Sequence, residues 1–301
     1  MIKNTLDIIN SPKYESSKFT LKYKELLDRD GYCLLPPDKS YWEWIGANPE
    51  DIRAIINSLL NKEGISAGSE GKEEFTVNKG KKIEQGAIRL GNLLNKNKIF
   101  SKIATIPEII QASHSIIQDD IKLSSVLFRQ PELNGEEQEI HIDWEPRWSE
   151  DEDYNDVIAF LYLEDANKSN GATTVVPGTH KKLGYPCQHI NQNLKHRDEF
   201  LIEAKKGSIL ILNALTWHKG GSNQSGQDRG IIVVDYRNRK LKQLLNLKMY
   251  INENIIKKLS ITEKYLFGLR KNDNFQKEKS VGPGEKYKNW LKKNPEFNYS
   301  K

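Results

Sequence analysis

The sequence predicts a mainly β protein with helical decoration at both ends. Short runs rich in β-branched and apolar residues occupy the middle of the chain, and Gly, Pro and Asn turn residues separate them. These runs lie at 122–130, 138–143, 156–165, 172–178, 207–215 and 229–237. Consecutive short strands without intervening helices favour a β-sandwich or barrel over βαβ units.

Helical segments are expected on both sides of these strands. Within 16–37 we expect a helix that ends near Asp30-Gly31, followed by a buried strand from Tyr32 to Leu35. A helix is expected at 41–62, and a Gly- and Ser-rich loop or hairpin at 63–82. Residues 92–119 have helical spacing, with Pro107 at a helix start. Beyond residue 240, Leu, Ile and Tyr punctuate a lysine-rich sequence, as in amphipathic helices. No repeat and no clear linker divides the chain.

Composition narrows the class of protein. The chain has 301 residues, is 37% hydrophobic and has a mean hydropathy of −0.68. The start of the sequence lacks the basic and apolar regions of a secretory signal, and no window approaches the ~18 apolar residues of a membrane span. Cys33 and Cys187 form no disulfide framework and no CxxC motif. We therefore expect a cytoplasmic protein without a membrane partner.

Charge is unevenly distributed. Residues 237–301 carry 17 Lys and Arg against 6 Asp and Glu, whereas the remainder carries 29 against 35. A basic tail is compatible with a nucleic acid or another anionic partner. The apolar residues between the lysines favour helices with a solvated face instead, so binding to nucleic acid is not expected.

A metal centre is suggested by "EQEIHIDWEP" at 137–146. In a strand, His141 and Asp143 share one face, so their side chains can converge on one ion. His218, after the apolar run at 207–215, is the best candidate for a third ligand. Two His and one carboxylate are the ligands of non-haem Fe(II) oxygenases. A buried His–Asp hydrogen bond, plain surface polarity and a metal-free catalytic dyad are the alternatives, although no GxSxG motif accompanies the pair.

Arg229 is a candidate for binding a carboxylate. It follows His218 by eleven residues, and the intervening "KGGSNQSGQD" is turn-forming, so antiparallel flanking strands would return Arg229 to the metal side. A bidentate Arg beside a metal suits 2-oxoglutarate, whose keto-acid end chelates iron. An ordinary salt bridge at a strand edge is the alternative.

The chain resembles the phytanoyl-CoA dioxygenase family of Fe(II)/2-oxoglutarate-dependent oxygenases, which includes the ectoine hydroxylases. The likeness rests on "YKELLDRDGYCLLPP" near the start, "HID" at 141–143, "DANKSNGATTVVPGTHKK" at 165–182 and "WHKGGSNQSGQDR" at 217–229. It extends from about residue 18 to about residue 237. It implies a cupin-like double-stranded β-helix (jelly roll) domain over 1–240, and leaves 241–301 as a basic helical extension.

The resemblance also implies cofactors and residue roles. Iron would be held by His141, Asp143 and His218, and the distal carboxylate of 2-oxoglutarate by Arg229, with O₂ as the other cosubstrate. Further cosubstrate contacts would come from Thr174 and Gln130. Many relatives carry a hydroxyl residue where this chain has Gly220, two places after His218, which puts one cosubstrate hydrogen bond in doubt. Related halogenases lack the carboxylate, so the presence of Asp143 disfavours halogenation.

Substrate contacts are inferred from position alone. Phe160 and Tyr162 share one face of their strand and are expected to line the pocket, with packing against a helical layer as the alternative. The loop "WEPRWSEDEDYND" at 144–156 could cover the metal and supply Trp144, Arg147 and Trp148. Its acidity suggests an amine-bearing substrate, or simply a solvated loop.

These expectations lead to one leading hypothesis for the function and to several alternatives. The leading hypothesis is hydroxylation of an unactivated C–H bond of a small metabolite, with release of succinate and CO₂. Desaturation or ring closure would use the same residues. The alternatives are an oxygenase that modifies a protein or nucleic acid, a catalytically silent jelly-roll binding protein, and a zinc hydrolase on the same three ligands. The oligomeric state is left open.

Overall fold

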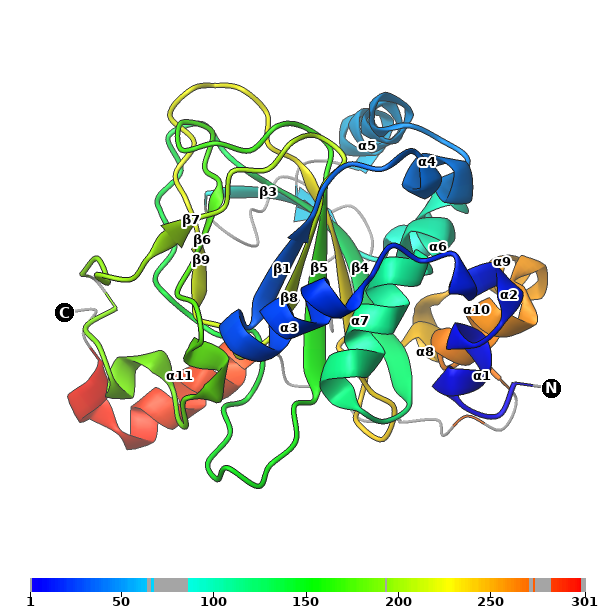
Figure 1. The fold of residues 1–301 in the computed structure, drawn as a ribbon. Helices are drawn as coiled ribbons and strands as arrows, with labels where there is room; N and C mark the ends of the chain where they lie inside the picture. Colours follow the sequence, from blue (N-terminus) through cyan, green and yellow to red (C-terminus); the bar gives the residue numbers. More distant parts are fainter. Residues whose placement is uncertain are drawn as a thin grey trace.

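Two facing β-sheets with helices on one side form the core of the fold (Figure 1). The computed structural model describes residues 2–63, 66–67, 86–192, 194–270, 273 and 283–298. Most of the loop or hairpin expected at 63–82 therefore lies outside the described residues. The mainly antiparallel sheets and the helical layer agree with the predicted jelly roll.

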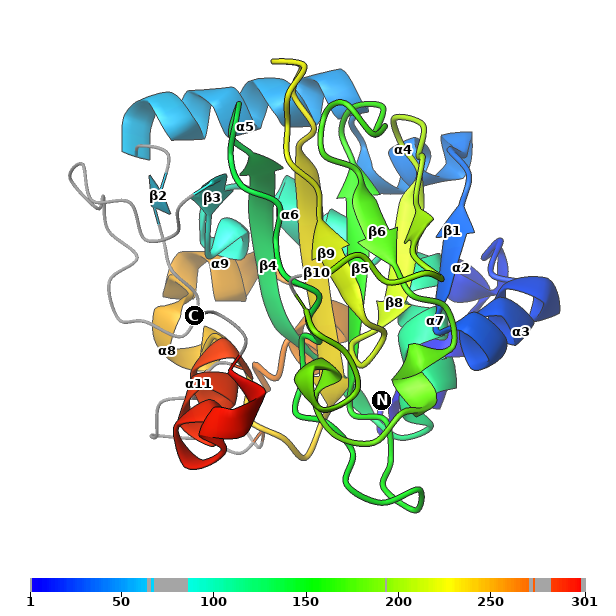
Figure 2. The same ribbon diagram turned by 90° about the vertical axis from the view of Figure 1, so that its left-hand side faces the viewer.

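The larger sheet has the order β1-β8-β5-β10-β4-β3-β2. Its strands are β1 (Tyr32–Leu35), β8 (Ile209–Asn213), β5 (Asp156–Tyr162), β10 (Ile231–Asn238), β4 (Ile121–Pro131), β3 (Ala87–Leu90) and β2 (Ser66–Ala67). All neighbours are antiparallel except β2 and β3. The smaller sheet, β7-β6-β9, contains β7 (Phe200–Leu201), β6 (Thr173–Val175) and β9 (His218–Gly220). Figure 2 shows it in front of the larger sheet.

Alternation along the strands divides the core in two. Ala159 and Leu161 of β5 point toward the helices and join the larger apolar cluster, whereas Phe160 and Tyr162 point between the sheets. The helical layer against the outer face includes α6 (Ile99–Ala104) and α7 (Pro107–Ile117) (Figure 1). The favoured inward orientation of Phe160 and Tyr162 is thus what the structure has.

The predicted helix at 41–62 is two helices. The first is α4 (Lys39–Ile45), and the second is α5 (Pro49–Glu63). Gly46 ends the first helix in the left-handed conformation, with φ of 78°, which glycine adopts at little cost. The region 92–119 likewise divides into η1 (Leu93–Asn95), α6 and α7.

The predicted strand at 138–143 was wrong as a regular strand. The segment is extended but pairs only through an isolated bridge between His141 and His218. The strand expected at 207–215 ends at Asn213, and His218 begins β9 in the other sheet. His218 therefore lies in the smaller sheet, whereas Arg229 directly precedes β10 of the larger sheet, because the chain changes sheets again between β9 and β10.

Helices from both termini complete the molecule. They are α1 (Thr5–Ile9), α2 (Pro12–Glu15), α3 (Leu21–Asp30), α8 (Leu247–Tyr250), α9 (Glu253–Lys258), α10 (Ile261–Leu266) and α11 (Pro283–Lys293), and the remaining short turns are η2 (Thr179–Lys181), η3 (Pro186–Gln188) and η4 (Pro295–Phe297). Leu245, Tyr265 and Phe267 belong to the same apolar cluster as α7 and the large sheet. The segment that follows residue 240 thus shares the core of the β domain, while α11 lies apart, near the smaller sheet (Figure 1).

Gly31 provides a stability test of the α3–β1 turn. Its φ is +82°, and a Cβ built there would lie 2.3 Å from Thr216 Oγ1 and 2.5 Å from His180 Nδ1. We expect Gly31→Ala to lower the free energy of unfolding by about 1–3 kcal/mol through crowding, in addition to the backbone cost. Gly46→Ala is the matched control, since its φ is +78° and nothing lies within 4 Å of its Cβ; it should cost only ~1 kcal/mol. Equal losses in urea denaturation would contradict the steric explanation.

Candidate metal centre

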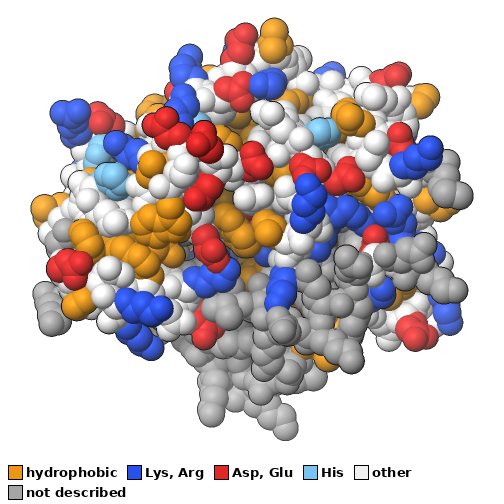
Figure 3. Space-filling model, turned by 90° about the horizontal axis from the view of Figure 1, so that it is seen from below, with side chains coloured by type: hydrophobic (Ala, Val, Ile, Leu, Met, Phe, Trp, Pro, Cys, Tyr) orange, Lys and Arg blue, Asp and Glu red, His pale blue; other side chains and the backbone are white. Residues whose placement is uncertain are grey.

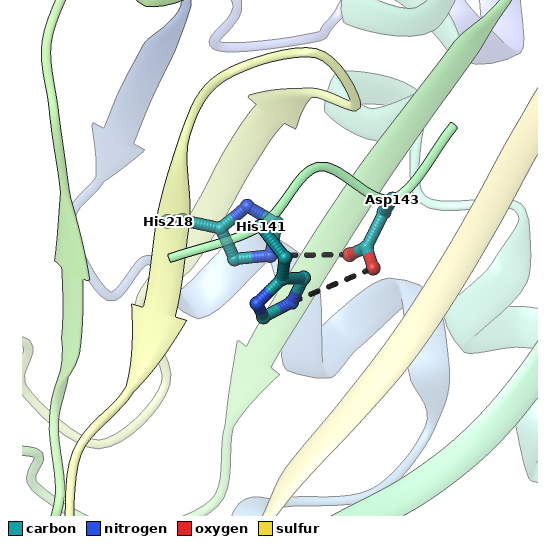
Figure 4. Close-up of side chains that lie close together, drawn as sticks. All are labelled: His141, Asp143 and His218. Carbon is teal, nitrogen blue, oxygen red and sulfur yellow. Dashed lines mark ion pairs between the residues drawn. The ribbon is translucent and has the colours of Figure 1, made fainter. Parts of the chain in front are cut away.

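Three side chains converge between the sheets. One nitrogen each from His141 and His218 and one carboxylate oxygen of Asp143 lie within 4.8 Å of one another, and no other group of this kind occurs in the described part of the chain. Asp143 Oδ2 is 3.1 Å from His218 Nε2, and Asp143 Oδ1 is 3.7 Å from His141 Nε2 (Figure 4). These atoms face a common point, as ligands of one metal ion do.

Backbone hydrogen bonds fix this convergence. The His141 N–H donates to the carbonyl oxygen of His218 at 2.9 Å, and the His218 N–H donates back at 3.1 Å. The Asp143 N–H donates to the carbonyl oxygen of Ala214 at 2.8 Å. Residues that are far apart in sequence are thereby held side by side, while alternation places His141 and Asp143 on the same side of their segment.

The hydrogen bonds of the imidazole rings suit metal binding. His141 Nδ1 lies 2.8 Å from the Glu139 carbonyl oxygen, and His218 Nδ1 lies 2.9 Å from the Thr216 carbonyl oxygen. A carbonyl oxygen only accepts, so each Nδ1 carries the hydrogen and each Nε2 offers its lone pair. The residues present therefore fit a first-row divalent metal such as Fe(II).

The electrostatics of the two rings differ. Desolvation and the nearby His218 lower the pKa of His141 to about 4, so this ring is neutral near pH 7. Desolvation also opposes protonation of His218, but the charge of Asp143 and the hydrogen bond to it outweigh that effect and raise the pKa of His218. Metal binding at His218 Nε2 therefore competes with protonation of this ring, which Asp143 favours.

The three side chains open into a cavity of about 310 Å³ between the sheets. Polar and apolar side chains from both sheets line it, among them Arg89, Leu127, Arg129, Phe160, Thr173, Arg229, Ile231, Val233, Asp235 and Arg237. Phe160 lines the cavity as predicted, whereas Tyr162, which was predicted to line it too, is fully buried between the sheets and is not part of the cavity wall. A cavity of this size accommodates a small ligand.

Arg229 occupies the cavity wall beside Tyr162 and Thr173. Its side chain is buried, and its Nη2 donates to the Gly171 carbonyl oxygen at 2.6 Å. Its Nε has no hydrogen-bond partner among the described residues. Burial lowers the pKa of Arg229 to about 10, which still leaves it charged at pH 7. A charged guanidinium with an unused donor in the wall of a cavity fits a carboxylate such as the distal one of 2-oxoglutarate.

The structure does not bring two of the predicted cosubstrate residues to this cavity. Thr174 faces the other side of β6 and lines a separate surface pocket, while Thr173 faces the metal centre. Gln130 accepts a hydrogen bond from Arg53 at 2.9 Å and donates one to Asp228 at 2.8 Å. In both cases the residue one position earlier lines the cavity, because successive side chains of a strand point to opposite faces.

Contacts of Gly220 explain why this chain lacks the hydroxyl residue that many relatives carry at this position. The Gly220 N–H donates to Gln138 Oε1 at 2.9 Å, and a Cβ at Gly220 would lie 2.6 Å from that oxygen. Both residues line the cavity. Gln138 therefore occupies the space that a side chain at position 220 would require.

The loop after Asp143 lies mainly outside the cavity. Arg147 donates to the Tyr154 hydroxyl at 3.0 Å and to the Glu150 carbonyl oxygen, so it fixes the loop itself. Trp148 is half exposed and contacts Trp290 of α11. The acidic side chains at 150–153 are exposed.

Trp144 is the member of this loop that lies beside the cavity. Its ring lies under the guanidinium of Arg237, 4.5 Å from the guanidinium carbon, and within 5.4 Å of Lys286 of α11. The loop and α11 lie on the face seen in Figure 3, where hydrophobic side chains form a patch beside acidic and basic ones. The loop does not bring its acidic side chains to the metal centre.

Sequence reasoning missed four charged residues of the cavity wall. Arg89 and Arg129 stand on β3 and β4, and Asp235 and Arg237 stand on β10. The available signal was a charged residue at every second position of an otherwise apolar strand, such as Asp235 and Arg237 after Val233. Such residues must be paired or face a cavity.

Comparison with solved structures places the fold in a known class. HygX from Streptomyces hygroscopicus, solved with nickel, 2-oxoglutarate and hygromycin B, is 14% identical, with a TM-score of 0.56 over 74% of this chain and 89% of HygX. The α-ketoglutarate-dependent epimerase SnoN from nogalamycin biosynthesis is 17% identical, with a TM-score of 0.53 over 72% and 82%. The carbocyclase SnoK of the same biosynthesis is also 17% identical, with a TM-score of 0.53 over 75% and 86%. These likenesses show that the chain shares its fold with α-ketoglutarate-dependent enzymes.

The family follows from the sequence itself. The sequence profile of the phytanoyl-CoA dioxygenase family matches residues 27–231, and the chain belongs to this family. Two uncharacterised proteins, from Mycobacterium bovis and Mycobacterium tuberculosis, are 24% identical over 94 residues, which is 31% of this chain and 33% of theirs. The match thus covers about a third of those relatives. Within the part of the chain that the structure describes, no helix is long and apolar enough to cross a membrane.

Proposed function

We propose that the protein hydroxylates an unactivated C–H bond of a small metabolite with Fe(II), 2-oxoglutarate and O₂, and releases succinate and CO₂. The observation that carries the proposal is the presence of His141, Asp143, His218 and Arg229 around one cavity of about 310 Å³. A catalytically silent binding protein has no need for metal ligands and a carboxylate-binding arginine together. We further propose a cytoplasmic location, since both described cysteines are free and buried.

Each residue would have a limited task. His141, Asp143 and His218 would hold the metal, and Arg229, with Tyr162 beside it, would orient 2-oxoglutarate. Phe160, Ile231 and Val233 would exclude water from the reacting C–H bond. The iron and its cosubstrate, when bound, supply the oxidative chemistry.

The size of the cavity and the neighbouring enzymes support a small substrate. HygX has been solved with hygromycin B and SnoN with a nogalamycin compound, both small molecules. Epimerisation and ring closure, the reactions of SnoN and SnoK, would need no additional residue type. Modification of a protein or nucleic acid is the less favoured alternative, because the metal centre lies between the sheets.

The decisive experiment is succinate release by anaerobically reconstituted protein. Fe(II), 2-oxoglutarate and O₂ would be supplied, and a metabolite extract would be added or withheld. We expect 2-oxoglutarate-dependent succinate that the extract stimulates. Absence of succinate together with absence of Fe(II) and 2-oxoglutarate binding in calorimetry would reject the proposal, and hydrolytic activity with Zn(II) alone would favour a zinc hydrolase.

Arg229→Lys tests the cosubstrate site. Lysine keeps the charge but lacks the planar fork that pairs with a carboxylate through two hydrogen bonds. Loss of a charge-assisted bond worth about 1.5–3 kcal/mol should weaken 2-oxoglutarate binding by about 10–100-fold. Calorimetry on Mn(II)-loaded protein measures this affinity without turnover. An unchanged affinity would show that Arg229 does not bind the cosubstrate.

A further inference from the structure

We propose that the C-terminal helix α11 forms the outer wall of the substrate cavity, and that the substrate passes through the space beside Gly284. The proposal rests on the proposed function and gives a role to the basic extension. The family profile matches residues 27–231, so this wall lies outside the part of the chain that defines the family. It is therefore a feature of this chain that can determine which substrates reach the metal.

Gly284 is the part of α11 that reaches the cavity. It lies in the first turn of the helix and lines the same cavity as His141, Asp143 and His218. Gly284 is itself exposed, so the cavity meets the surface there. A Cβ built at Gly284 would meet no atom within 4 Å, and its φ lies outside the left-handed region that favours glycine. Glycine is also a poor helix former, so the effect of this residue is to leave space at the mouth of the cavity.

Two contacts hold the start of α11 against the loop that follows Asp143. Lys286 forms an ion pair with Glu145, and its ammonium nitrogen lies 5.4 Å from the centre of the Trp144 ring. The guanidinium carbon of Arg237, a residue of the cavity wall, lies 4.5 Å from the centre of the same ring. The first turn of α11 is thereby fixed next to the cavity wall.

Aromatic side chains anchor the rest of α11. The centre of the half-buried Trp290 ring lies 4.9 Å from that of Tyr185 and 6.3 Å from that of Trp148. The Tyr287 ring lies 4.9 Å from Tyr185, and the Tyr287 hydroxyl donates to Gln192 Oε1 at 2.7 Å. The helix is thus held by one face, and loss of one large aromatic side chain should loosen the wall without disturbing the buried core.

The first test measures access to the metal. Fe(II)-loaded protein with 2-oxoglutarate is mixed anaerobically with the chelator bipyridine, and the coloured iron complex reports the rate of iron loss. We expect Trp290→Ala to increase this rate by about 2–10-fold, the effect of losing an aromatic pair, and Gly284→Trp to slow it. Glu285→Trp and Lys288→Ala are the matched controls, since both residues are exposed on α11, and both should keep the wild-type rate.

Fe(II) affinity distinguishes a wall from a support for the metal ligands. Gln192 Nε2 donates to the carbonyl oxygen of Ile140, which directly precedes His141, so a structural effect on the metal centre is the competing explanation for Trp290→Ala. Calorimetry should show the same Fe(II) and 2-oxoglutarate affinities in wild type and all variants. Faster iron loss with correspondingly weaker Fe(II) binding would overturn the proposal, as would wild-type rates in both Trp290→Ala and Gly284→Trp.

The second test measures entry of the substrate. Succinate release is followed while a metabolite extract is titrated into each protein with Fe(II), 2-oxoglutarate and O₂. We expect Gly284→Trp to lose the stimulation by the extract and to keep the KM for 2-oxoglutarate, and Glu285→Trp to behave as wild type. Full stimulation of Gly284→Trp would show that the substrate does not pass α11. If the wild type neither binds 2-oxoglutarate nor releases succinate, the proposed function itself fails, whereas the rates of iron loss still decide whether α11 covers the cavity.

Discussion

Asp143→Ala is expected to abolish 2-oxoglutarate-dependent succinate release and to weaken Fe(II) binding by at least about 100-fold, since even the outer partners of metal ligands contribute ~10–100-fold. Asp143 supplies the carboxylate of the three-residue cluster, and its two oxygens face the Nε2 atoms of His218 and His141. Without it, two neutral imidazoles remain, and they lack the negative charge that offsets a divalent ion. Anaerobic calorimetry with Fe(II) measures the affinity directly.

The chain offers a matched control for this variant. His196 and Asp198 have the same spacing as His141 and Asp143, with His196 Nδ1 3.9 Å from Asp198 Oδ2. Asp198 is exposed, and no further His, Cys, Asp or Glu completes a metal cluster there among the described residues. Asp198→Ala should therefore leave Fe(II) affinity and succinate release unchanged. Equal effects of the two substitutions would show that the metal is bound elsewhere.

This pair of H-x-D segments shows what sequence could and could not predict. Local pattern alone does not separate 141–143 from 196–198. The difference is the bridge between His141 and His218, a contact between residues far apart in sequence. The family motifs identified His218 as the partner. The change of sheet between β8 and β9 that creates the bridge is a property of tertiary pairing and has no local signal.

The two wrongly predicted cosubstrate residues, Gln130 and Thr174, result from choosing the wrong face of a strand. Apolar runs predicted β4, β5 and β10 within a few residues, because buried strands have a strong compositional signal. Successive residues of a strand point to opposite faces, so an error of one residue selects the wrong side chain. In β4 the inward residue is Arg129 and not Gln130. In β6 it is Thr173 and not Thr174. In β5, Phe160 and Tyr162 were placed on the correct face because both residues of the alternate face are small or aliphatic.

Replacement of Arg237 should have the largest effect on stability. Its side chain is almost fully buried, lies 2.8 Å from a carboxylate oxygen of Asp156, and donates to the carbonyl oxygen of Lys242 at 2.7 Å. Arg237→Met keeps much of the volume but leaves the buried pair of acidic side chains, Asp156 and Asp235, without its cation. Breaking a buried ion pair in this way costs about 3–5 kcal/mol. Urea denaturation of the metal-free protein measures the loss.

The control for Arg237 is an exposed ion pair. Lys24 and Asp28 pair one turn apart on α3, and Lys24→Met should change the free energy of unfolding by less than ~1 kcal/mol. A loss of similar size in both variants would mean that the Arg237 network contributes no more than a surface pair.

The protonation of Asp156 makes this network dependent on pH. Burial and the adjacent Asp235 raise the pKa of Asp156 well above 3.8, so the folded protein holds this proton up to a higher pH than the unfolded chain does. The stability from this group is therefore fully present below the unfolded pKa and is lost as the pH rises through the folded pKa. Asp156→Asn keeps a hydrogen-bond donor and cannot ionise. Relative to wild type it should gain stability as the pH rises above the ordinary aspartate pKa of about 4 toward the raised pKa of the folded protein. A difference between the two proteins that stays constant over this range would mean that Asp156 is ionised in the fold and that Arg237 balances both carboxylates alone.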